Sequence, residues 1–463
     1  MALVESLSGI RGIYGKDLTE SSAVTYAYAY YSFLRKKTKK NNPTIVIGMD
    51  TRPSGVKLAD AIMGILDCNF IDVGIAPTPA VEFAVRHFAA DGGIIITASH
   101  NEPYWNGFKF LGANGGVLNE LEMHSIISNF KTIRNFHKIQ ERRIIEKNSE
   151  TVKEYTNFVF SIIGKENIGT IKDSTQKIVI DPNGGTGVIA KHIVEQLGVR
   201  VICVNSVYGD FNRAVEPNED SLIYLKNVTD KNNADFAAGF DCDADRVEIL
   251  LNNGQILSGD HILGLIVSEV LSESKNPRNQ TVVVNDATSN LVRRIVADFG
   301  AKMKEVQVGE INVVEEMRRS KAMVGGEGSS GGAIIQPSKC RDGILTLCML
   351  LSIISKKEKK LADLANDLPK YCTLRKKVEY NISRHNDIKK SLKKYYSKKG
   401  FEVRETGGVK GSLKVITGKN SFVWFRASKT EGNLFRIMSD SDEEMEAEIL
   451  MEEAVKVFNK ANE

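Results

Sequence analysis

At 463 residues the chain is too long for a single hydrophobic core, and its length favours three or four domains. The 42% hydrophobic and 26% charged residues are typical of a soluble globular protein, and the formal net charge of +4 is too small to indicate a nucleic-acid-binding protein. No stretch of about 18 uncharged apolar residues occurs, so the sequence predicts no membrane-spanning helix.

The six cysteines are scattered along the chain, and none of them forms a Cys-x-x-Cys pair. This spacing favours neither a zinc knuckle nor a disulfide framework. Residues 1–10 have no basic start and no long apolar segment, so no export signal is expected. We therefore expect reduced thiols and a cytoplasmic protein.

The first 100 residues alternate predicted helices and strands. Residues 19–37 are expected to form a helix capped at Thr19 or Ser21, and residues 57–66 a second helix. Two apolar runs are typical of buried strands in a parallel sheet: 44–48 and 70–73. This alternation indicates a wound α/β domain with functional loops at one edge of its sheet.

Short turns separate these elements. Residues 8–12 are expected to form a tight, glycine-flanked turn that exposes Arg11. The strand at 44–48 leads into the turn 50–54, and Pro77-Thr78-Pro79 is expected to separate a strand from the next helix.

A further apolar run, 92–96, stops abruptly at Thr97-Ala98-Ser99-His100-Asn101. A buried strand that ends in such a turn presents a polar side chain at the carboxyl edge of an α/β sheet. Ser99 is therefore a candidate for the residue that carries out chemistry. The alternative is that Ser and Asn merely cap the end of the strand.

The segment from 130 to 151 is charged and weakly periodic, and a second α/β unit follows it. Its predicted strands are 177–180 and 235–240, and the second strand leads directly into Asp241, Asp243, Asp245 and Arg246.

The three aspartates alternate, so their carboxylates can point the same way and repel one another unless a cation neutralises them. Oxygen-only ligands in a short loop suit Mg²⁺. The neighbouring Arg246 is suited to donate hydrogen bonds to a phosphate group. The alternative is a solvated acidic turn.

A third unit follows the same plan. Its predicted helices begin at Asp260 and Ser289, its strands are 281–285 and 322–324, and a glycine-rich loop with Glu327 and Ser329 follows the second strand. Glu327 can accept hydrogen bonds from sugar hydroxyls with help from Ser329, or the loop is only a flexible turn. The turn 341–343 is expected to open a long apolar helix that ends near 355.

From about residue 370 the chain changes to charged strands, a Lys-rich helix at 387–399 and a C-terminal helix from 442. This pattern indicates a smaller α+β domain. Arg426, Ser428 and Thr430 can bind a phosphate dianion there, to which Lys429 adds a charge. The alternative is a hairpin with an exposed arginine.

Six stretches together make the sequence similar to the α-D-phosphohexomutase family, the phosphoglucomutases and phosphomannomutases, over essentially the whole chain. They are Ser8-Gly9-Ile10-Arg11-Gly12, Asp50-Thr51-Arg52-Pro53-Ser54, Thr97-Ala98-Ser99-His100-Asn101 with Asn106-Gly107-Phe108-Lys109, Asp241-Cys242-Asp243-Ala244-Asp245-Arg246, Gly326-Glu327-Gly328-Ser329 and Arg426-Ala427-Ser428-Lys429-Thr430-Glu431.

The resemblance implies three similar wound α/β domains and a smaller α+β C-terminal domain around a central cleft. We place domain I, with the phosphoserine loop, at 1–150 and domain II, with the metal loop, at 151–252. Domain III, with the sugar-binding loop, is placed at 253–369, and domain IV, with the phosphate-binding loop, at 370–463.

The resemblance also implies the roles of the site residues. Ser99 would carry the phosphoryl group and share Mg²⁺ with Asp241, Asp243 and Asp245. Arg11, Lys109 and Arg246 would neutralise phosphoryl charge. The resemblance implies six residues that would bind substrate: Glu327, Ser329, Arg426, Ser428, Lys429 and Thr430.

Lys109, together with His100, is the expected proton-transfer group, and the alternative is that Lys109 only binds phosphate. Three features depart from the family pattern. Cys242 stands where glycine is usual, Lys429 adds a charge, and Ser330 and Gly331 replace a Gly-His pair, so the sugar loop offers no histidine.

The expected function is therefore interconversion of hexose 1- and 6-phosphates, glucose or mannose, through phosphoserine and a bound hexose 1,6-bisphosphate. Phosphoglucosamine mutase is an alternative enzyme, and an inactive sugar-phosphate-binding protein is an alternative of another class. We expect hexose phosphates as partners, with neither nucleic acid nor membrane. The sequence leaves the oligomeric state open, a homo-oligomer included.

Overall fold

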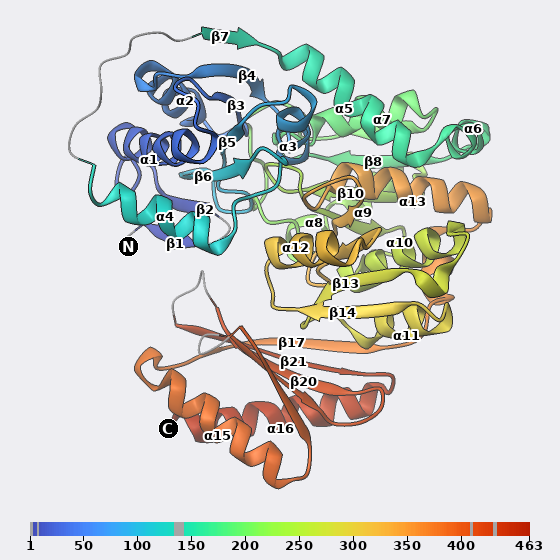
Figure 1. Ribbon diagram of the computed structural model, residues 1–463. Helices are drawn as coiled ribbons and strands as arrows, with labels where there is room; N and C mark the ends of the chain where they lie inside the picture. Colours follow the sequence, from blue (N-terminus) through green and yellow to red (C-terminus); the bar gives the residue numbers. More distant parts are fainter. Residues whose placement is uncertain (1–2, 7–8, 134–142, 408–410, 429–432) are drawn as a thin grey trace. The chain divides into compact units, whose positions relative to one another are not determined.

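The computed structural model describes residues 3–6, 9–133, 143–407, 411–428 and 433–463 (Figure 1). The chain divides into two compact units, one of residues 1–258 with 330–362 and the other of residues 259–329 with 363–463. Among the described residues, every helix is too short or too polar to cross a lipid bilayer.

The first unit begins with a seven-stranded sheet in the order β1-β2-β6-β5-β3-β4-β7. Its strands are β1 (Val4–Ser6), β2 (Gly9–Ile13), β3 (Thr44–Met49), β4 (Asn69–Ile75), β5 (Gly92–Ile96), β6 (Trp105–Gly112) and β7 (Arg143–Glu146). The helices of this part are α1 (Glu20–Thr38), α2 (Gly55–Ile65), α3 (Thr78–His87) and α4 (Glu120–Phe130). Strands β3, β4, β5 and β7 pair in parallel, whereas β6 pairs antiparallel with β5 and β2.

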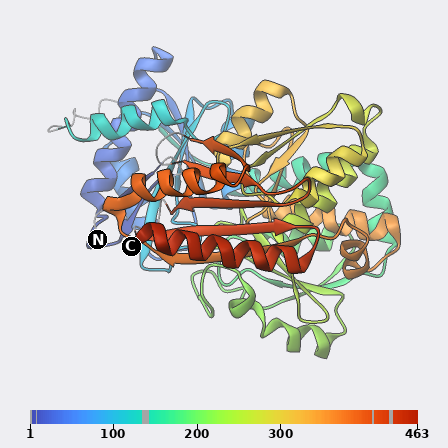
Figure 2. The same ribbon diagram turned by 90° about the horizontal axis from the view of Figure 1, so that it is seen from below.

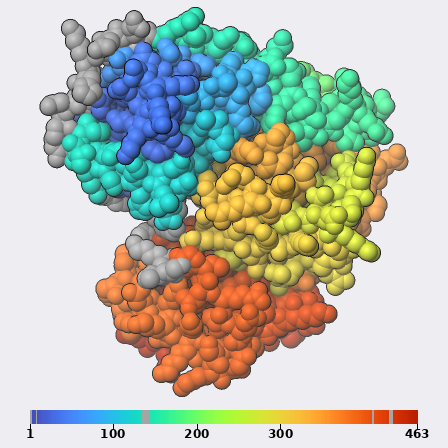
Figure 3. All heavy atoms as spheres, viewed as in Figure 1, coloured from blue at the N-terminus to red at the C-terminus, as the bar shows by residue number. Residues whose placement is uncertain are grey.

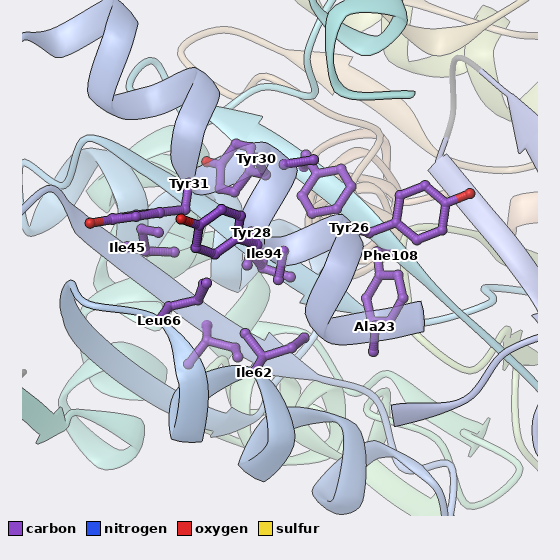
Figure 4. Packing of buried hydrophobic residues seen from close by; sticks show 14 of the residues in the cluster. Ala23, Tyr26, Tyr28, Tyr30, Tyr31, Ile45, Ile62, Leu66, Ile94 and Phe108 are labelled. Carbon is purple, nitrogen blue, oxygen red and sulfur yellow. The ribbon is translucent and has the colours of Figure 1, made fainter. Parts of the chain in front are cut away.

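Helix α1 carries much of this domain's core on its tyrosine-rich face. The Thr19 side chain accepts from the Ser22 amide and caps the helix, so of the two predicted caps, Thr19 and Ser21, it is Thr19 that serves. Tyr26 and Tyr30 are buried, and the Tyr30 hydroxyl donates to the Leu111 carbonyl oxygen at 2.6 Å. Figure 4 shows both tyrosines in this core, which also contains Ile62 of α2 and strand residues of the sheet.

The expected turn at residues 8–12 is wrong, because residues 9–13 form strand β2, and Arg11 pairs with Gly107 of β6. The glycines serve close approach rather than a turn. A Cβ on Gly107 would lie 2.1 Å from the Ile10 carbonyl oxygen, and one on Gly9 would lie 2.4 Å from that of Phe108. Gly9 also has a φ of +125°, a backbone conformation that residues with a side chain rarely adopt.

The second sheet has five strands in the order β12-β11-β10-β8-β9. They are β8 (Lys177–Asp181), β9 (Arg200–Cys203), β10 (Phe236–Phe240), β11 (Val247–Leu251) and β12 (Ile256–Leu257). The helices are α5 (Asn148–Ile163), α6 (Lys165–Asp173), α7 (Val188–Gln196), α8 (Glu219–Leu222) and α9 (Leu225–Asn232). Strand β10 is parallel to β8 but antiparallel to β11, so the loop 241–246 joins two neighbouring strands.

Residues 330–362 complete the first unit with β16 (Ala333–Ile335) and the apolar helix α13 (Gly343–Lys357). Asp342 caps α13 by accepting from the Leu345 amide at 2.8 Å. Both of its carboxylate oxygens also lie 2.8 Å from the hydroxyl of Tyr155 on α5. The cap therefore attaches α13 to α5.

The second unit begins with α10 (Gly259–Glu273), η1 (Pro277–Asn279), β13 (Thr281–Asn285), α11 (Asn290–Asp298), β14 (Lys302–Val306), α12 (Glu310–Ser320) and β15 (Val324–Gly326). Strand β13 is central and pairs in parallel with β14 and β15. Strand β15 begins two residues later than the expected strand's start at 322, because residues 322–323 still belong to the connection from α12.

The C-terminal domain has an antiparallel sheet in the order β17-β21-β20-β19-β18, preceded by α14 (Leu361–Asn366). The other elements are β17 (Cys372–Glu379), η2 (Ile382–Arg384), α15 (His385–Lys398), β18 (Glu402–Thr406), β19 (Ser412–Ile416), β20 (Phe422–Ala427), β21 (Leu434–Ser441) and α16 (Glu444–Asn462). Figure 2 shows the orange α15 and the red α16 running alongside the strands of this sheet, and Val423 and Phe425 of β20 belong to the core that includes residues of both helices. The intervening Trp424 packs with Ala287 on the other face, and alternation places Arg426 on that face too.

Buried polar contacts join this sheet to the preceding α/β domain, and the two adjoin in Figure 3 as the yellow and the orange-to-red segments. Asp440 accepts from the Ser289 hydroxyl at 2.5 Å and the Asn290 amide at 2.9 Å. Asp286 accepts from Ser412. The predicted fold class, three α/β domains and a smaller α+β domain at the C-terminus, is confirmed.

Candidate functional site

Ser99 lies in the loop between β5 and its antiparallel neighbour β6. The glycine and isoleucine run of β5 is fully buried, and the chain turns where the polar residues begin. Ser99 has a φ of +52°, and its amide donates to the Thr97 hydroxyl at 2.8 Å. The side chain is thus fixed at a sheet edge in a conformation that few non-glycine residues adopt.

Asp241, Asp243 and Asp245 lie in the corresponding loop of the second sheet, between β10 and β11. All three are buried, and they offer carboxylate oxygens that lie within 4.8 Å of one another. The Ser99 hydroxyl donates to Asp241 Oδ2 at 3.1 Å. The structure therefore brings together the four residues that the sequence analysis assigned to a metal.

The oxygen atoms of this cluster fit a hard divalent cation. Among the described residues, Asp243 Oδ1 and Asp245 Oδ1 have no hydrogen-bond partner although they are buried. Burial and repulsion from Asp245 and Asp243 raise the pKa of Asp241 well above its ordinary value. Three carboxylates and a serine oxygen form a donor set that suits Mg²⁺.

Lys109 and Thr78 donate hydrogen bonds to the other carboxylate oxygens, the Oδ2 atoms, of Asp243 and Asp245. Lys109 on β6 donates to Asp243 Oδ2 at 2.8 Å and to Asp245 Oδ2 at 3.1 Å. The Thr78 hydroxyl, at the start of α3, donates to Asp243 Oδ2 at 2.6 Å, and its amide donates to the Asp243 carbonyl oxygen. These contacts leave the two Oδ1 atoms for a cation.

Three arginines surround the cluster. Arg11 donates to Asn101 at 2.8 Å, and burial and the charge of Arg246 lower its pKa to about 10. The Arg246 side chain lies 3.8 Å from Asp245, and Arg341 lies 3.4 Å from the same residue. The site thus combines oxygen ligands with a concentration of positive charge that suits a phosphoryl group.

The pKa values of two neighbouring groups reflect this balance. Burial favours the protonated form of Asp245, but the charges of Lys109 and Arg341 lower its pKa below the ordinary value. His100 Nδ1 lies 3.4 Å from the Ser99 hydroxyl. Burial and the charge of Arg246 lower the pKa of His100 well below its ordinary value, so the imidazole is neutral.

Sequence reasoning missed Thr78 and Arg341 as members of this group. Thr78 lies in the Pro77–Pro79 segment, which was interpreted only as a turn, and Arg341 was assigned to the turn that opens α13. The sequence signal that could have found such residues is a polar residue placed just after a buried strand. This signal identifies Thr78, which follows β4, but it does not apply to Arg341.

Four of the six expected substrate-binding residues are among those that the structure describes, and all four belong to the second unit. Glu327 is buried and accepts from the Asn285 amide group at 2.8 Å and the Gly309 amide at 2.9 Å. Ser329 is exposed and Ser428 is half-buried. Lys429 and Thr430 lie outside the described residues.

Arg426 is 7% exposed, and its Nε atom has no hydrogen-bond partner among the described residues. Burial lowers its pKa, whereas Asp286 and Glu327 oppose that shift. A buried guanidinium with an unused donor is suited to an anionic ligand.

Three family profiles match the chain. They describe α/β/α domain I of phosphoglucomutase/phosphomannomutase at residues 5–137, domain II at residues 153–254 and domain III at residues 258–371. The matches cover the loops that contain Ser99, the three aspartates and Glu327.

Known proteins match over nearly the full length. The chain is 33% identical over 462 residues to a phosphoglucomutase/phosphomannomutase of Thermococcus kodakarensis, with 98% of each chain covered. It is 32% identical to a probable phosphoglucosamine mutase of Pyrococcus abyssi, with 98% of this chain and 97% of the relative covered. Further relatives at 29% to 33% identity are named phosphoglucosamine mutase or probable phosphoglucosamine mutase.

A crystal structure of a phosphoglucomutase/phosphomannomutase family protein from Burkholderia thailandensis has the same fold. It superposes with a TM-score of 0.83 at 22% identity and covers 99% of this chain and 97% of its own.

Proposed function

The chain belongs to the α-D-phosphohexomutase family, whose members are phosphotransferase isomerases, and we propose that it interconverts hexose 1- and 6-phosphates through a phosphorylated Ser99. The observation that supports this most directly is the Ser99 hydroxyl 3.1 Å from Asp241, next to two aspartates whose buried Oδ1 atoms accept no hydrogen bond among the described residues. A serine nucleophile of the Ser-His-Asp kind needs a base oriented by a carboxylate, and here the carboxylates lie at the serine itself.

The reaction is a pair of phosphoryl transfers. In the first, a hydroxyl oxygen of the hexose phosphate forms a bond to phosphorus while the bond from phosphorus to Ser99 Oγ breaks. The hydroxyl proton passes to a nearby base, and the product is a hexose 1,6-bisphosphate. The bisphosphate then turns around, and Ser99 Oγ forms a bond to its other phosphorus while the bond from that phosphorus to the sugar oxygen breaks. The proton of Ser99 passes to the sugar oxygen, and the isomeric monophosphate is released.

The residues of the first unit serve this exchange by orientation and charge. The negative charge on the oxygens of the phosphoryl group is neutralised by Arg11, Arg246 and Arg341. Asp241, Asp243, Asp245 and Ser99 would hold Mg²⁺, which supplies further charge neutralisation when it is bound. His100 is neutral and 3.4 Å from Ser99, so it can accept a proton.

Lys109 has a double role in this proposal. Its ammonium group orients Asp243 and Asp245, and it lies among the groups that receive the phosphoryl charge. Proton transfer to and from the sugar hydroxyl is assigned to Lys109 with His100.

Residues of the second unit would bind the rest of the substrate. Glu327 would accept hydrogen bonds from sugar hydroxyls with Ser329, and Arg426 with Ser428, Lys429 and Thr430 would bind the phosphate that is not being transferred. This assignment follows the proposed division into domains at 1–150, 151–252, 253–369 and 370–463.

Glucose and mannose phosphates are the proposed substrates, in line with the name of the Thermococcus kodakarensis relative. Glucosamine phosphate is the second candidate, because more of the similar relatives bear the name phosphoglucosamine mutase. The sugar loop itself does not decide, since Ser330 and Gly331 stand where the family often has Gly-His.

The test compares kcat/KM for glucose, mannose and glucosamine 1-phosphates with Mg²⁺ and the matching 1,6-bisphosphate. Turnover of glucose and mannose phosphates is expected to exceed that of glucosamine phosphate. Strong selectivity for glucosamine phosphate would favour the second candidate. Absence of turnover on all three, with no phosphorylation of Ser99, would instead indicate a sugar-phosphate-binding protein.

A further inference from the structure

Arg52 lies in the turn that follows β3, and its side chain is completely buried. It is one of the largest fully buried side chains among the described residues, at 2% exposure for the whole residue. Its Nε atom donates to Asp50 Oδ2 at 3.0 Å, and its own amide donates to Asp50 Oδ1 at the same distance. A buried guanidinium with one carboxylate partner still has four N–H groups to satisfy.

All four of these groups are directed at backbone carbonyl oxygens of the Ser99 loop. Nη1 donates to Glu102 at 2.7 Å and to Trp105 at 3.2 Å. Nη2 donates to Ser99 at 2.8 Å and to Asn101 at 2.6 Å. One side chain therefore satisfies carbonyl groups across the loop 99–105.

These bonds fix the backbone of the phosphorylatable residue on both sides. The Ser99 amide donates to Thr97 Oγ1 at 2.8 Å, and the Ser99 carbonyl oxygen accepts from Arg52. The φ of Ser99 is +52°, a left-handed conformation that is unfavourable for a non-glycine residue and persists only where its surroundings enforce it. With both peptide groups held, the hydroxyl remains directed at Asp241.

We propose that Arg52 is a positioning residue for phosphoryl transfer, which holds the Ser99 loop in one conformation whether or not Ser99 carries a phosphoryl group. This inference rests on the proposed function of Ser99. It differs from the roles of Arg11, Arg246 and Arg341, because every described N–H of Arg52 is used within the protein and none is directed at substrate.

Lysine cannot replace arginine in this role. The guanidinium is a planar fork whose two terminal nitrogens reach two pairs of carbonyl oxygens, whereas a lysine has a single nitrogen with three donors. Arg52→Lys keeps the charge beside Asp50 but leaves carbonyl groups of the loop without a donor.

The matched control is Arg213→Lys. Arg213 is also a buried arginine paired with an aspartate, with Nε 2.5 Å from Asp181 Oδ2 and side-chain exposure of 4%. Its carbonyl acceptors belong to residues 181, 214 and 240, and none lies in the Ser99 loop. Each variant thus loses a buried guanidinium that bonds an aspartate and several backbone carbonyl oxygens, but the two guanidinium groups serve different loops.

The experiment measures the rate of Ser99 phosphorylation by glucose 1,6-bisphosphate from intact mass, together with kcat, KM, the thermal midpoint and amide hydrogen exchange. For Arg52→Lys we expect phosphorylation and kcat to fall on the order of 10²-fold, with KM near that of the wild type. Faster exchange should be confined to the segment around 97–105. Arg213→Lys should lower the thermal midpoint by a similar amount and keep a phosphorylation rate close to the wild type.

Equal losses of rate in the two variants, or no loss in Arg52→Lys, would overturn the proposal. If Arg52→Lys does not fold, exchange in the wild-type protein decides: protection of the loop should be the same before and after phosphorylation, and a rearranged loop would overturn the inference. A wild-type protein that takes up no phosphoryl group would instead refute the proposed function itself.

Discussion

The Ser99 hydroxyl lies 3.1 Å from Asp241 Oδ2, although the two residues are 142 positions apart in the chain. Each residue follows a buried strand and precedes an antiparallel partner strand, in two different sheets. The same architecture thus supplies a serine from one α/β domain and the proposed metal-binding loop from the next. This arrangement fits phosphoryl transfer, in which alignment and charge neutralisation provide most of the catalysis.

Thr78 is expected to tune the metal site, because its hydroxyl holds Asp243 Oδ2 at 2.6 Å. Thr78→Val removes this bond and leaves Lys109 as the donor described for that oxygen. We expect Mg²⁺ to bind on the order of 10- to 100-fold more weakly, as for other residues that orient metal ligands. Isothermal titration calorimetry with Mg²⁺ measures the change directly.

Thr151→Val is the matched control for Thr78. Thr151 is equally buried, and among the described residues its hydroxyl has no hydrogen-bond partner. This substitution should leave the Mg²⁺ affinity unchanged, and Thr78→Ser should retain most of it. Equal affinities in Thr78→Val and the wild type would show that Thr78 does not orient Asp243.

Lys109 should affect metal binding as well as turnover. Lys109→Met removes the donor that orients the Oδ2 atoms of Asp243 and Asp245, so the two carboxylates are no longer held in place and Mg²⁺ binding should weaken. We expect kcat to fall 10²- to 10⁴-fold, roughly the range for loss of a proton-transfer group.

Lys109→Arg separates the two contributions of this residue. It keeps a charged donor for these oxygens, so the Mg²⁺ affinity should recover, whereas kcat should remain low because a guanidinium does not release its proton. Recovery of kcat in Lys109→Arg would indicate that Lys109 acts only through its charge.

Arg426 should determine substrate affinity rather than the rate of the chemical step. Arg426→Gln removes a buried guanidinium with an unused Nε donor, and the loss of a charge-assisted hydrogen bond corresponds to a KM increase on the order of 10- to 100-fold. Steady-state kinetics with a hexose 1-phosphate gives KM and kcat separately. Arg404→Gln, which removes an exposed ion pair with Glu402, should change neither. A fall in kcat at constant KM would argue against a phosphate-binding role.

The buried carboxyl group of Asp440 should make the stability of the folded protein depend on pH. Burial raises its pKa to about 6, although hydrogen bonds from Ser289, Asn290 and Thr373 oppose the shift. The folded state therefore binds this proton more tightly than the unfolded state, where the pKa has its ordinary value near 4. The stabilisation is fully present below about pH 4 and is lost as the pH rises through about 6, and it amounts to about 3 kcal/mol for the group.

Asp440→Asn should remove this part of the pH dependence. The test is the thermal midpoint of wild type and variant between pH 4 and 7, where the difference between the two should shift in favour of Asp440→Asn as the pH rises. Asp342, whose pKa burial also raises to about 6, should leave a residual slope in the variant. Parallel profiles for the two proteins would contradict the assignment.

The sequence was sufficient for elements whose pattern is local. The buried runs before Ser99 and Asp241 identified strands β5 and β10, and Thr19 identified the start of α1. These features depend on apolar periodicity and capping chemistry, which act over a few residues.

Contacts between distant parts of the chain were not predictable in the same way. Residues 8–12 were expected to form a turn because glycine favours turns, whereas here glycine permits two strands to approach closely. Thr78 contacts Asp243 across 165 positions, and Arg52 contacts the loop of Ser99 across nearly 50. No local pattern encodes such partners, since tertiary packing determines them.

The central claim, that Ser99 is the phosphoryl carrier, is tested most directly by intact-mass measurement before and after incubation with glucose 1,6-bisphosphate and Mg²⁺. The wild-type protein should gain the mass of one phosphoryl group, located on Ser99 by fragmentation, and Ser99→Ala should gain none and show no mutase activity. A wild-type protein that gains no phosphoryl group, or a Ser99→Ala variant with full mutase activity, would contradict the account.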